Sequence, residues 1–326
     1  MPFYFTIKHE RSRIGLFRKP IRIKTMRLKR LLILCVALSA SVFSFADDFV
    51  YDNLKYTTSS DKSVTLVDGK SASGEVIIPS VVRNNKKVYS VTAIAHNAFE
   101  RNNAITAVTI PSSVSTIGYS AFNSCKGLQR VMDASRVVEM QGFEYTDCTS
   151  LTSVTLSGTL QKIGYRSFAG TALTRLVLPE SVKEIGGEAF QDCYQLTSVQ
   201  LDKGLLYIKD HAFKNSGLTI LQFPEGIKEI GEWSFEGCKS LKTVQIPQSV
   251  TTLGTGAFYT CSALESVVLP SSLTHIGDRT FNGCCHLSAV YYLGSSCPSL
   301  GQNTFVDVSN DFGFYVKPSA LPVLHG

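Results

Sequence analysis

A repeat of 22 or 23 residues is the feature that most constrains how this chain can fold. The string EIGGEAFQDCYQLTSVQL at 184–201 returns almost unchanged as EIGEWSFEGCKSLKTVQI at 229–246. An apolar residue, usually followed by Gly, opens each copy, at Ile94, Ile117, Met140, Ile163, Ile185, Ile208, Ile230, Leu253 and Ile276. The spacing is 23 residues, apart from two steps of 22. A fixed period of this length is typical of a solenoid, in which each unit stacks on its neighbours.

Each copy also carries an aromatic side chain five residues after the opening apolar residue. A unit of 23 residues cannot bury an apolar face by itself, so neighbouring copies, here called rungs, must share one continuous core. The aromatic column is therefore expected to form the centre of that core. Its members are Phe99, Phe122, Tyr145, Phe168, Phe190, Phe213, Phe235, Phe258 and Phe281.

The end of each rung has the pattern of a half-buried strand. In LTSVQL (196–201), Val199 and Leu201 alternate with Ser198 and Gln200, which is the period of a strand with one buried face. Stacked rungs would place these strands parallel and about 4.8 Å apart. Proline often follows and ends the strand, because it cannot donate to the ladder; it stands at Pro111, Pro179, Pro224, Pro247 and Pro270.

Two further segments complete each rung. KEIG (183–186) is expected to be a second short extended piece, in which Gly186, like its equivalent Gly231, allows a tight turn. The following GEAFQDC (187–193) is expected to carry the aromatic ring inward, as an irregular turn or as a turn of 3₁₀ helix.

The combined motif I-G-x-x-A-F-x-x-C-x-x-L-x-x-V-x-[L/I]-P closely resembles the BspA-like, or treponemal-type, leucine-rich repeats. It stands here as IGYSAFNSCKGLQRV (117–131), IGGEAFQDCYQLTSVQL (185–201) and LGTGAFYTCSALESVVLP (253–270). The resemblance covers about two-thirds of the chain. The flanks resemble the family too, because residues 47–82 are similar to its N-terminal β cap and FGFYVKPSAL (312–321) to its closing strand.

The resemblance implies a β-rich solenoid: a leucine-rich-repeat-like, right-handed stack of about nine 22–23-residue rungs with short parallel strands, plus an N-terminal β cap. The expected organisation is a leader at 1–46, the N-terminal β cap at 47–93, the leucine-rich repeat solenoid at 94–292, and a C-terminal cap with the closing strand at 293–326. The motif is least regular at VMDASRVV (131–138), which lacks the proline, and at MQGFEY (140–145). An irregular rung of this kind can mark a bend.

The leader has the three parts of a secretory signal peptide. MRLKR (26–30) is basic, LLILCVALSASVF (31–43) is apolar, and SFA (44–46) places small residues before a cut after Ala46, with Met26 as the natural start. A membrane anchor is the weaker alternative, because the apolar run is short for a membrane span. The mature chain is therefore expected to be exported, either secreted or at the cell surface, and to have no transmembrane span.

The net charge of +6 does not indicate nucleic-acid binding. The leader carries ten Lys or Arg residues and one Glu, which leaves 22 basic and 25 acidic residues in 47–326. The excess of positive charge thus belongs to the leader and not to the repeats, so we expect no nucleic acid among the partners.

Eight cysteines follow the leader, an even number that suggests disulfides in an exported protein. Six of them share one repeat column: Cys125, Cys148, Cys193, Cys238, Cys261 and Cys284. Thr171 and Ser216 flank Cys193 in this column, and Asn102 is its first member. A column that accepts these residues selects small buried side chains, which favours free packed thiols. Cys285 with Cys297 is the remaining candidate for a disulfide.

No constellation in the sequence indicates catalysis or a bound metal. There is no C-x-x-C pair, and four histidines fall at different repeat positions, at His96, His211, His275 and His286. G-x-S-x-G, H-E-x-x-H, P-loop and dinucleotide-binding motifs are absent from the sequence. We therefore expect a protein that is not an enzyme and uses no metal or cofactor.

Stacked strands would present two outward columns of side chains. One column is Ala107, Arg130, Ser153, Arg175, Ser198, Ile220, Thr243, Ser266 and Ala289; the other is Thr109, Met132, Thr155, Val177, Gln200, Gln222, Gln245, Val268 and Tyr291. One interpretation is purely structural, since stacked Thr, Ser and Gln stabilise a parallel ladder. The other is a binding platform, because arginine is favoured at interface hot spots. The predicted contact residues are Arg130, Arg175, Gln200, Gln222, Gln245 and Tyr291.

The resemblance implies adhesion, since BspA-like proteins are associated with attachment to host matrix and to other bacteria. The expected function is that of a secreted or cell-surface interaction protein that binds an extracellular protein or glycan, with host matrix among the candidates, through a face of the solenoid. The alternative is a structural or scaffold component of the cell envelope with no host partner. The oligomeric state stays open.

Overall fold

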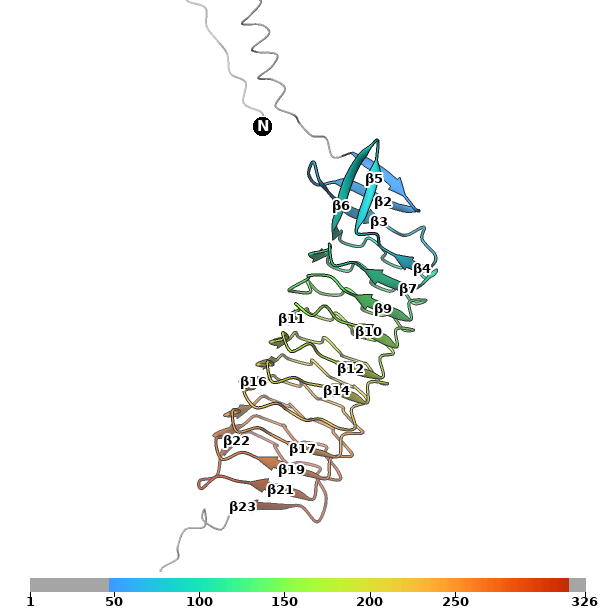
Figure 1. Cartoon of the computed structure of the whole chain (residues 1–326). Helices are drawn as coiled ribbons and strands as arrows, with labels where there is room; N and C mark the ends of the chain where they lie inside the picture. Colours follow the sequence, from blue (N-terminus) through green and yellow to red (C-terminus); the bar gives the residue numbers. More distant parts are fainter. Residues whose placement is uncertain (1–46, 317–326) are drawn as a thin grey trace, which may run out of the picture. The chain divides into compact units, whose positions relative to one another are not determined.

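The computed structural model describes residues 47–316; the predicted leader at 1–46 and the residues after Val316 lie outside this range. The described chain winds into a β solenoid of stacked rungs with parallel strands (Figure 1). The predicted fold class is confirmed. Residues 47–316 contain strands and turns, and no helix among them is long and apolar enough to cross a membrane.

The N-terminal cap is a mixed sheet that passes directly into the solenoid. Its strands lie in the order β1 (Asp48–Tyr51), β2 (Leu54–Thr58), β3 (Ser63–Asp68), β6 (Lys87–Ile94) and β5 (Val81–Asn84). The β1–β2, β2–β3 and β5–β6 pairs are antiparallel, whereas β3 pairs with β6 in parallel. The end of β6 also pairs with β8 (Thr116–Ile117), the first short strand of the solenoid. The cap therefore supplies a template on which the first rung stacks.

The longer strand of each rung lines one side of the stack, here called the sheet face. Neighbouring strands pair in parallel and in register, so that Arg130 lies beside Ala107 and Ser266 beside Thr243. The sheet has three parts, β4 (Gly74–Ile77), β7 (Ile105–Ile110), β9 (Arg130–Asp133) and β10 (Ser153–Thr155); β12 (Arg175–Val177) and β14 (Ser198–Gln200); and β17 (Thr243–Gln245), β19 (Ser266–Leu269), β21 (Ala289–Tyr292) and β23 (Gly313–Val316).

A second line of two-residue strands follows the opposite edge of the rungs. It comprises β11 (Lys162–Ile163), β13 (Glu184–Ile185), β15 (Tyr207–Ile208) and β16 (Glu229–Ile230), then β18 (Thr252–Leu253), β20 (His275–Ile276) and β22 (Ser299–Leu300). The glycine after these strands does not serve the tight turn that the sequence suggested, because Gly186 and Gly231 are not among the glycines with positive φ. A Cβ on Gly186 would lie 2.6 Å from the carbonyl oxygen of Ile163 in the preceding rung. Glycine is required here by the close approach of successive backbones.

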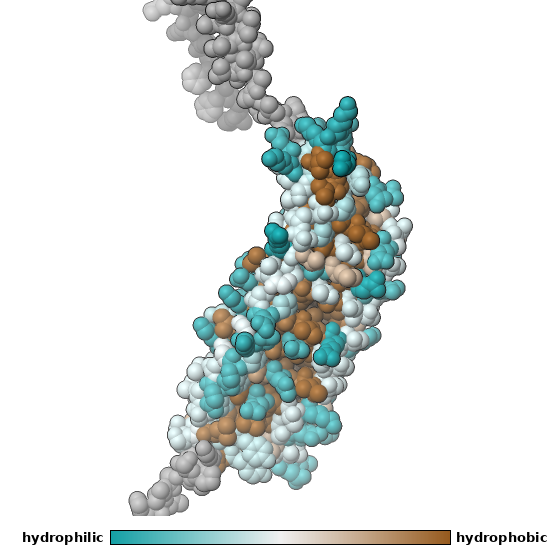
Figure 2. Space-filling model, in the orientation of Figure 1, coloured by the Kyte–Doolittle hydropathy of each residue, from teal (hydrophilic) through white to brown (hydrophobic). Residues whose placement is uncertain are grey.

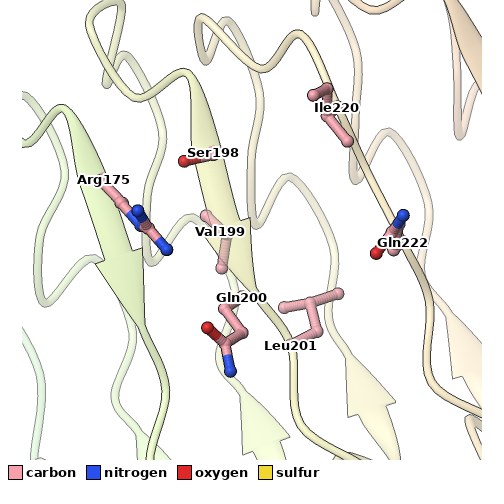
Figure 3. Close-up of a pocket in the computed structure, with 7 residues that line it drawn as sticks. All are labelled: Arg175, Ser198, Val199, Gln200, Leu201, Ile220 and Gln222. Carbon is pink, nitrogen blue, oxygen red and sulfur yellow. The ribbon is translucent and has the colours of Figure 1, made fainter.

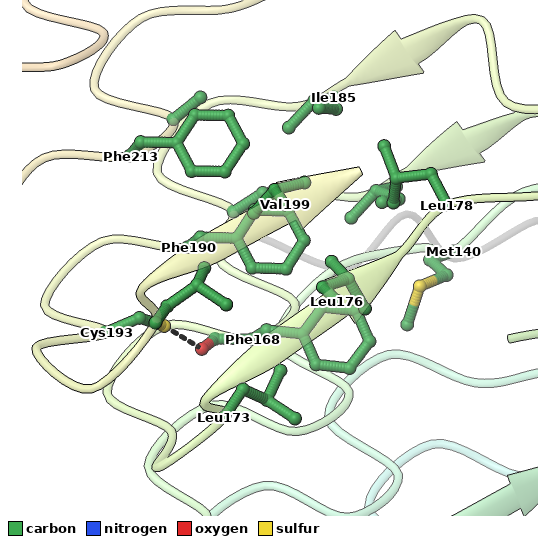
Figure 4. Packing of buried hydrophobic residues seen from close by; sticks show 14 of the residues in the cluster. Met140, Phe168, Leu173, Leu176, Leu178, Ile185, Phe190, Cys193, Val199 and Phe213 are labelled. Atoms are coloured by element: carbon green, nitrogen blue, oxygen red, sulfur yellow. Dashed lines mark hydrogen bonds between the residues drawn. The ribbon is translucent and has the colours of Figure 1, made fainter. Parts of the chain in front are cut away.

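The aromatic residues stack into one continuous ladder at the centre of the core (Figure 4). Ring centroids of successive rungs lie 4.8 to 5.6 Å apart, and no pair of rings is tilted by more than 14°. The predicted members from Phe99 to Phe281 are all buried to within 1 % exposure. The ladder also has a tenth ring, Phe305, which stacks on Phe281. The predicted repeat core is thus the observed core, and it extends one rung further towards the C-terminus.

The six column cysteines are buried free thiols, as interpreted from the sequence. Each sulfur donates to the carbonyl oxygen of the aromatic residue one rung earlier, at 3.0 to 3.3 Å, as Cys193 does to Phe168 in Figure 4. Asn102 takes this place in the first rung and donates its amide to the carbonyl oxygens of Gly69 and Ala72 in the cap, at 2.9 and 2.8 Å. Each of these six cysteines therefore ties its rung to the one before it.

The segment that carries the ring is a series of turns, with two residues per rung in the left-handed region. In one rung these are Glu188 (φ 53°) and Asp192 (φ 59°), on either side of Phe190. The Phe190 and Asp192 N–H groups donate to the Ala212 and Lys214 carbonyl oxygens of the next rung, at 2.7 and 2.8 Å. Backbone hydrogen bonds thus join neighbouring rungs along this side as well.

Two rungs are one residue shorter than the others, and the sheet is interrupted at both. In the longer rungs the next buried leucine stands three positions after the cysteine, as Leu196 does after Cys193, whereas Leu173 stands only two positions after Thr171. The missing residue shortens the turn before the strand. At the first short rung β12 does not pair with β10, and at the second only a single bridge joins Ser198 to Ile220.

Candidate functional site

The sheet face presents the two columns that the sequence predicted. Where the strands pair, each outward residue lies beside its equivalent in the next rung, as with Thr109 beside Met132 and Gln245 beside Val268. The cap strand β4 and the last strand β23 extend the columns, because Glu75 pairs with Ala107 and Tyr315 with Tyr291. In the orientation of Figure 1, hydrophobic side chains form a broken band along the stack beside hydrophilic ones (Figure 2). Exposed apolar residues on the face are Ile77, Met132, Val177, Ile220, Tyr291 and Tyr315.

Three of the predicted contact residues surround one shallow depression in this face. Arg175, Gln200 and Gln222 lie on three successive rungs, around a space of about 400 Å³ (Figure 3). Ser198, Val199, Leu201 and Ile220 complete its lining. The depression lies between the two short rungs, where the sheet is interrupted. This depression thus coincides with the shortened turns and with the interruption of strand pairing.

Arg175 is the charged side chain among the residues that line this depression. No carboxylate forms an ion pair with it within residues 47–316, and its strand presents it outward. The neighbouring amides of Gln200 and Gln222 offer both donors and acceptors. Ile220 is 63 % exposed and adds an apolar surface. A guanidinium, two amides and one exposed aliphatic side chain are suited to a mixed polar and apolar surface on a macromolecule.

A second depression, of about 320 Å³, lies on the other side of the rung that carries Gln222. Gln222 and Gln245 both contribute to it, together with Phe223, Glu225 and Pro247. Gln222 therefore stands between two neighbouring hollows. Four of the six predicted contact residues belong to this part of the face, from Arg175 to Gln245.

Arg130 lies in a different environment from Arg175. Its guanidinium is 3.5 Å from the Glu75 carboxylate, and both side chains are about half exposed. The two residues line a separate depression of about 270 Å³ together with Gln129 and Ser153. Glu75 was not recognised from the sequence, although GEVIIP (74–79) has the V-x-I-P pattern of the repeat strand. That pattern is the signal that places Glu75 in the outward column.

Tyr291 lies away from these depressions, near the C-terminal end of the face. Its ring stacks on that of Tyr315 with centroids 5.3 Å apart, and both rings are about half exposed. Phe305, in the rung between them, was also missed in the sequence. LGQNTF (300–305) has the opening apolar residue, the Gly and the aromatic residue of the motif, but follows Ile276 after 24 residues.

The titratable side chains of the described range were also compared with the geometry of a metal site. Between residues 47 and 316, no three His, Cys, Asp or Glu side chains converge as metal ligands would. The one fully buried carboxylate in that range is Glu144, whose oxygens accept from the Gly142 N–H and the Ser167 hydroxyl, at 2.8 Å each. Burial raises the pKa of Glu144, while these hydrogen bonds act in the opposite direction. Glu144 occupies the irregular rung at 140–145 and holds that rung to the next one.

Comparison with known proteins gives one family. The model of the BspA type leucine rich repeat region, a pattern of six copies, matches residues 84–197 and again 183–310. No curated protein matches the chain.

Two solved structures share the fold. A leucine-rich repeat protein from Bacteroides ovatus is 25 % identical, with a TM-score of 0.59 over 84 % of this chain and 80 % of that one. A leucine rich cell surface protein from Faecalibacterium prausnitzii is 18 % identical, with a TM-score of 0.52 over 83 % of this chain and 95 % of that one.

Proposed function

Because the chain belongs to the family of BspA-type leucine-rich repeat proteins, we propose that it is an extracellular interaction protein that binds its partner through the sheet face. The predicted signal peptide supports export, and the similar protein from Faecalibacterium prausnitzii is described as a cell surface protein. The repeat stack has the geometry of a binding platform rather than of an enclosed active site. The partner is an extracellular protein or glycan, with host matrix as the first class to test.

The observation that carries this proposal is the grouping of Arg175, Gln200, Gln222 and Gln245 around two adjoining depressions. These side chains come from four consecutive rungs whose aromatic rings stack in the core. Their positions are therefore fixed before binding, which lowers the entropy lost when a partner is bound. Arg175 sits where an acidic or carbonyl-rich group of the partner would complete an ion pair or a bidentate hydrogen bond.

The test is binding of the purified chain to a panel of matrix proteins, mucins and glycans, measured by biolayer interferometry. Arg175→Glu is expected to weaken the binding at least about tenfold, since a central arginine often contributes more than this at an interface. The matched control is Arg101→Glu, the same charge reversal at a turn residue whose side chain is 80 % exposed. That variant should bind as the wild type does.

The outcomes separate the two candidate functions. Binding that survives Arg175→Glu would show an interaction protein with its site elsewhere than the sheet face. Absence of any binding partner in the panel, with the protein retained in the cell envelope on fractionation, would favour the structural scaffold instead. Circular dichroism spectra of both variants establish that they are folded.

A further inference from the structure

A cluster of three aromatic side chains lies outside the buried ladder, on the turn segments of three successive rungs. The cluster consists of Tyr119, Phe143 and Tyr165, here called the aromatic platform. The Tyr119 and Phe143 centroids are 5.1 Å apart, and the Phe143 and Tyr165 centroids 5.4 Å. Tyr119 is 43 % exposed and Tyr165 46 %, with Phe143 half-buried between them. The predicted contact residues on the sheet face contribute nothing to this cluster.

Backbone hydrogen bonds join the three segments that carry these rings. Phe143 donates its N–H to the Tyr165 carbonyl oxygen at 2.9 Å, and Ser120 donates to that of Gly142 at 3.1 Å. Gly142 occupies the repeat position of the two tyrosines; its φ of 123° favours glycine, and a Cβ there would lie 3.0 Å from the Tyr165 carbonyl oxygen. Gly142 therefore interrupts the tyrosine position in this rung, and the ring between Tyr119 and Tyr165 comes from Phe143 instead.

Backbone geometry does not explain the choice of Phe143. The residue has φ 60°, at a repeat position that is left-handed in every described rung and elsewhere carries Asn, Ser, Arg, Glu, His, Gly and one other aromatic residue, Trp233. Asn and Gly adopt this conformation readily, whereas a bulky aromatic residue is disfavoured there. The ring is also not needed for the core, which already contains Tyr145 from the same rung. The Phe143 ring instead extends the apolar aromatic surface between Tyr119 and Tyr165, which a ligand can contact.

One charged pair borders the platform. The Arg166 guanidinium carbon lies 5.8 Å from the centroid of the Phe143 ring, and the Arg166 and Glu188 side chains form an ion pair at 2.6 Å. Tyr165 donates its hydroxyl hydrogen to the same carboxylate. The rim therefore has donors and acceptors but no net charge. Such a site favours a neutral ligand with an apolar face and many hydroxyl groups over a cation or an anion.

We infer that the aromatic platform binds a neutral carbohydrate, with pyranose rings stacked on Tyr119 and Tyr165. A pyranose ring has a flat face of C–H groups that packs against an aromatic ring and a rim of hydroxyl groups. The hydroxyl groups would accept from Arg166 and donate to Glu188. The row of rings follows the axis along which the rungs stack, so a chain of linked sugars fits it better than a single sugar. This site lies on the turn side of the rungs and is additional to the proposed sheet-face site.

The experiment is affinity electrophoresis of the purified full chain through native gels that contain neutral polysaccharides of glucose, galactose or mannose, such as hydroxyethylcellulose, dextran and galactomannan. At least one polysaccharide is expected to retard the wild type. The double variant Tyr119→Ala/Tyr165→Ala should lose this retardation, with an apparent Kd at least about tenfold higher. Tyr119→Phe/Tyr165→Phe keeps both rings and should retain most of the binding.

The matched control is Tyr194→Ala, which removes a tyrosine that is 68 % exposed and lies outside the platform. It should migrate as the wild type does in every gel. Retardation by none of the polysaccharides would overturn the inference, as would equal retardation of the wild type and of the alanine double variant with an unchanged far-ultraviolet spectrum. Neither result bears on the proposed sheet-face site, because Tyr119, Phe143 and Tyr165 do not belong to it. That site is tested separately by Arg175→Glu.

Discussion

At the scale of single residues, the column cysteines show how one side chain can serve both packing and hydrogen bonding. A thiol is nearly as apolar as a methyl group and is also a weak donor. Burial raises the pKa of Cys193 to about 11, so its sulfur stays protonated at neutral pH and keeps the hydrogen that it donates to Phe168. The column therefore serves packing, and a buried neutral thiol has low reactivity.

Glu144 gives a prediction for the dependence of stability on pH. Burial raises its pKa in the folded protein above the ordinary value of 4.5. The folded state then binds this proton more tightly than the unfolded state, so the stability from Glu144 is greatest below that ordinary value and is lost as the pH rises through the folded pKa. Glu144→Gln removes the titration but preserves an oxygen for the backbone N–H groups.

The measurement is urea unfolding of the wild type and of Glu144→Gln from pH 4 to pH 7.5. The free energy of unfolding of the wild type, relative to the variant, is expected to decrease as the pH rises. Glu180→Gln gives the baseline for the same exchange at an exposed glutamate. A relative stability that is constant, or that rises with pH, would contradict the assignment of a raised pKa.

At the scale of the rung, the glycine before the turn segment sets how closely two backbones approach. A Cβ on Gly254 would lie 2.8 Å from the Gly231 carbonyl carbon and 2.9 Å from the Glu232 nitrogen, both backbone atoms of the preceding rung. Gly254→Ala is therefore expected to lower the free energy of unfolding by about 1–3 kcal/mol, the range for overpacking. Gly158→Ala is the matched control, because nothing lies within 4 Å of a Cβ there.

Both glycine variants can be compared by chemical denaturation at a single pH. The control should change the stability by no more than about 0.5 kcal/mol, as most exposed substitutions do. Equal stabilities for the two variants would mean that the backbones at Gly254 shift apart at little cost in free energy. The recurrence of glycine at this position would then not be explained by close approach.

Much of the rung could be predicted from the sequence, because each position recurs in every copy. Comparison of the copies separates the residues that recur from those that vary. The Phe190 column, the alternation around Val199 and the packing of Cys193 all follow from the type of residue and its recurrence. The reason for Gly186 could not be predicted in this way. Its restriction comes from the backbone of another rung, 23 residues earlier, and glycine for a turn and glycine for a close approach look the same in a sequence.

The candidate site was predictable only in part. The outward direction of Arg130 and Arg175 follows from strand alternation, but the partner of Arg130 does not, because Glu75 lies in the cap and outside the aligned repeats. The depression near Arg175 depends on the two shortened turns, whose effect on strand pairing requires the three-dimensional structure. The aromatic platform was missed because Phe143 and the two tyrosines stand at different repeat positions.

At the scale of the whole molecule, each described rung contacts its two neighbours, and the aromatic ladder connects them. Stability is then the sum of contributions from each rung and from each interface between rungs. Phe190→Ala removes a fully buried ring within the ladder and should lower stability by about 3–5 kcal/mol. Because that ring stacks on both Phe168 and Phe213, the loss should spread to the rungs on either side.

Hydrogen exchange measured by mass spectrometry can test this expectation against a variant at the end of the ladder. Phe305→Ala removes a ring that stacks on Phe281 alone within the ladder, and faster exchange should be confined to the neighbouring C-terminal rungs. Phe190→Ala should accelerate exchange on both sides of residue 190. Uniform acceleration over residues 47–316 in both variants would show instead that the solenoid unfolds as a single cooperative unit.

The ladders between rungs also determine how this solenoid responds to mechanical tension. When one end of the stack is pulled, the interface between the outermost rung and its neighbour carries the load first. Rungs therefore detach one after another from the loaded end. Each detached rung of 22 or 23 residues releases about 75 Å of extended chain. A protein built in this way lengthens in steps under load while its remaining rungs stay folded, and its reach extends far beyond its folded length.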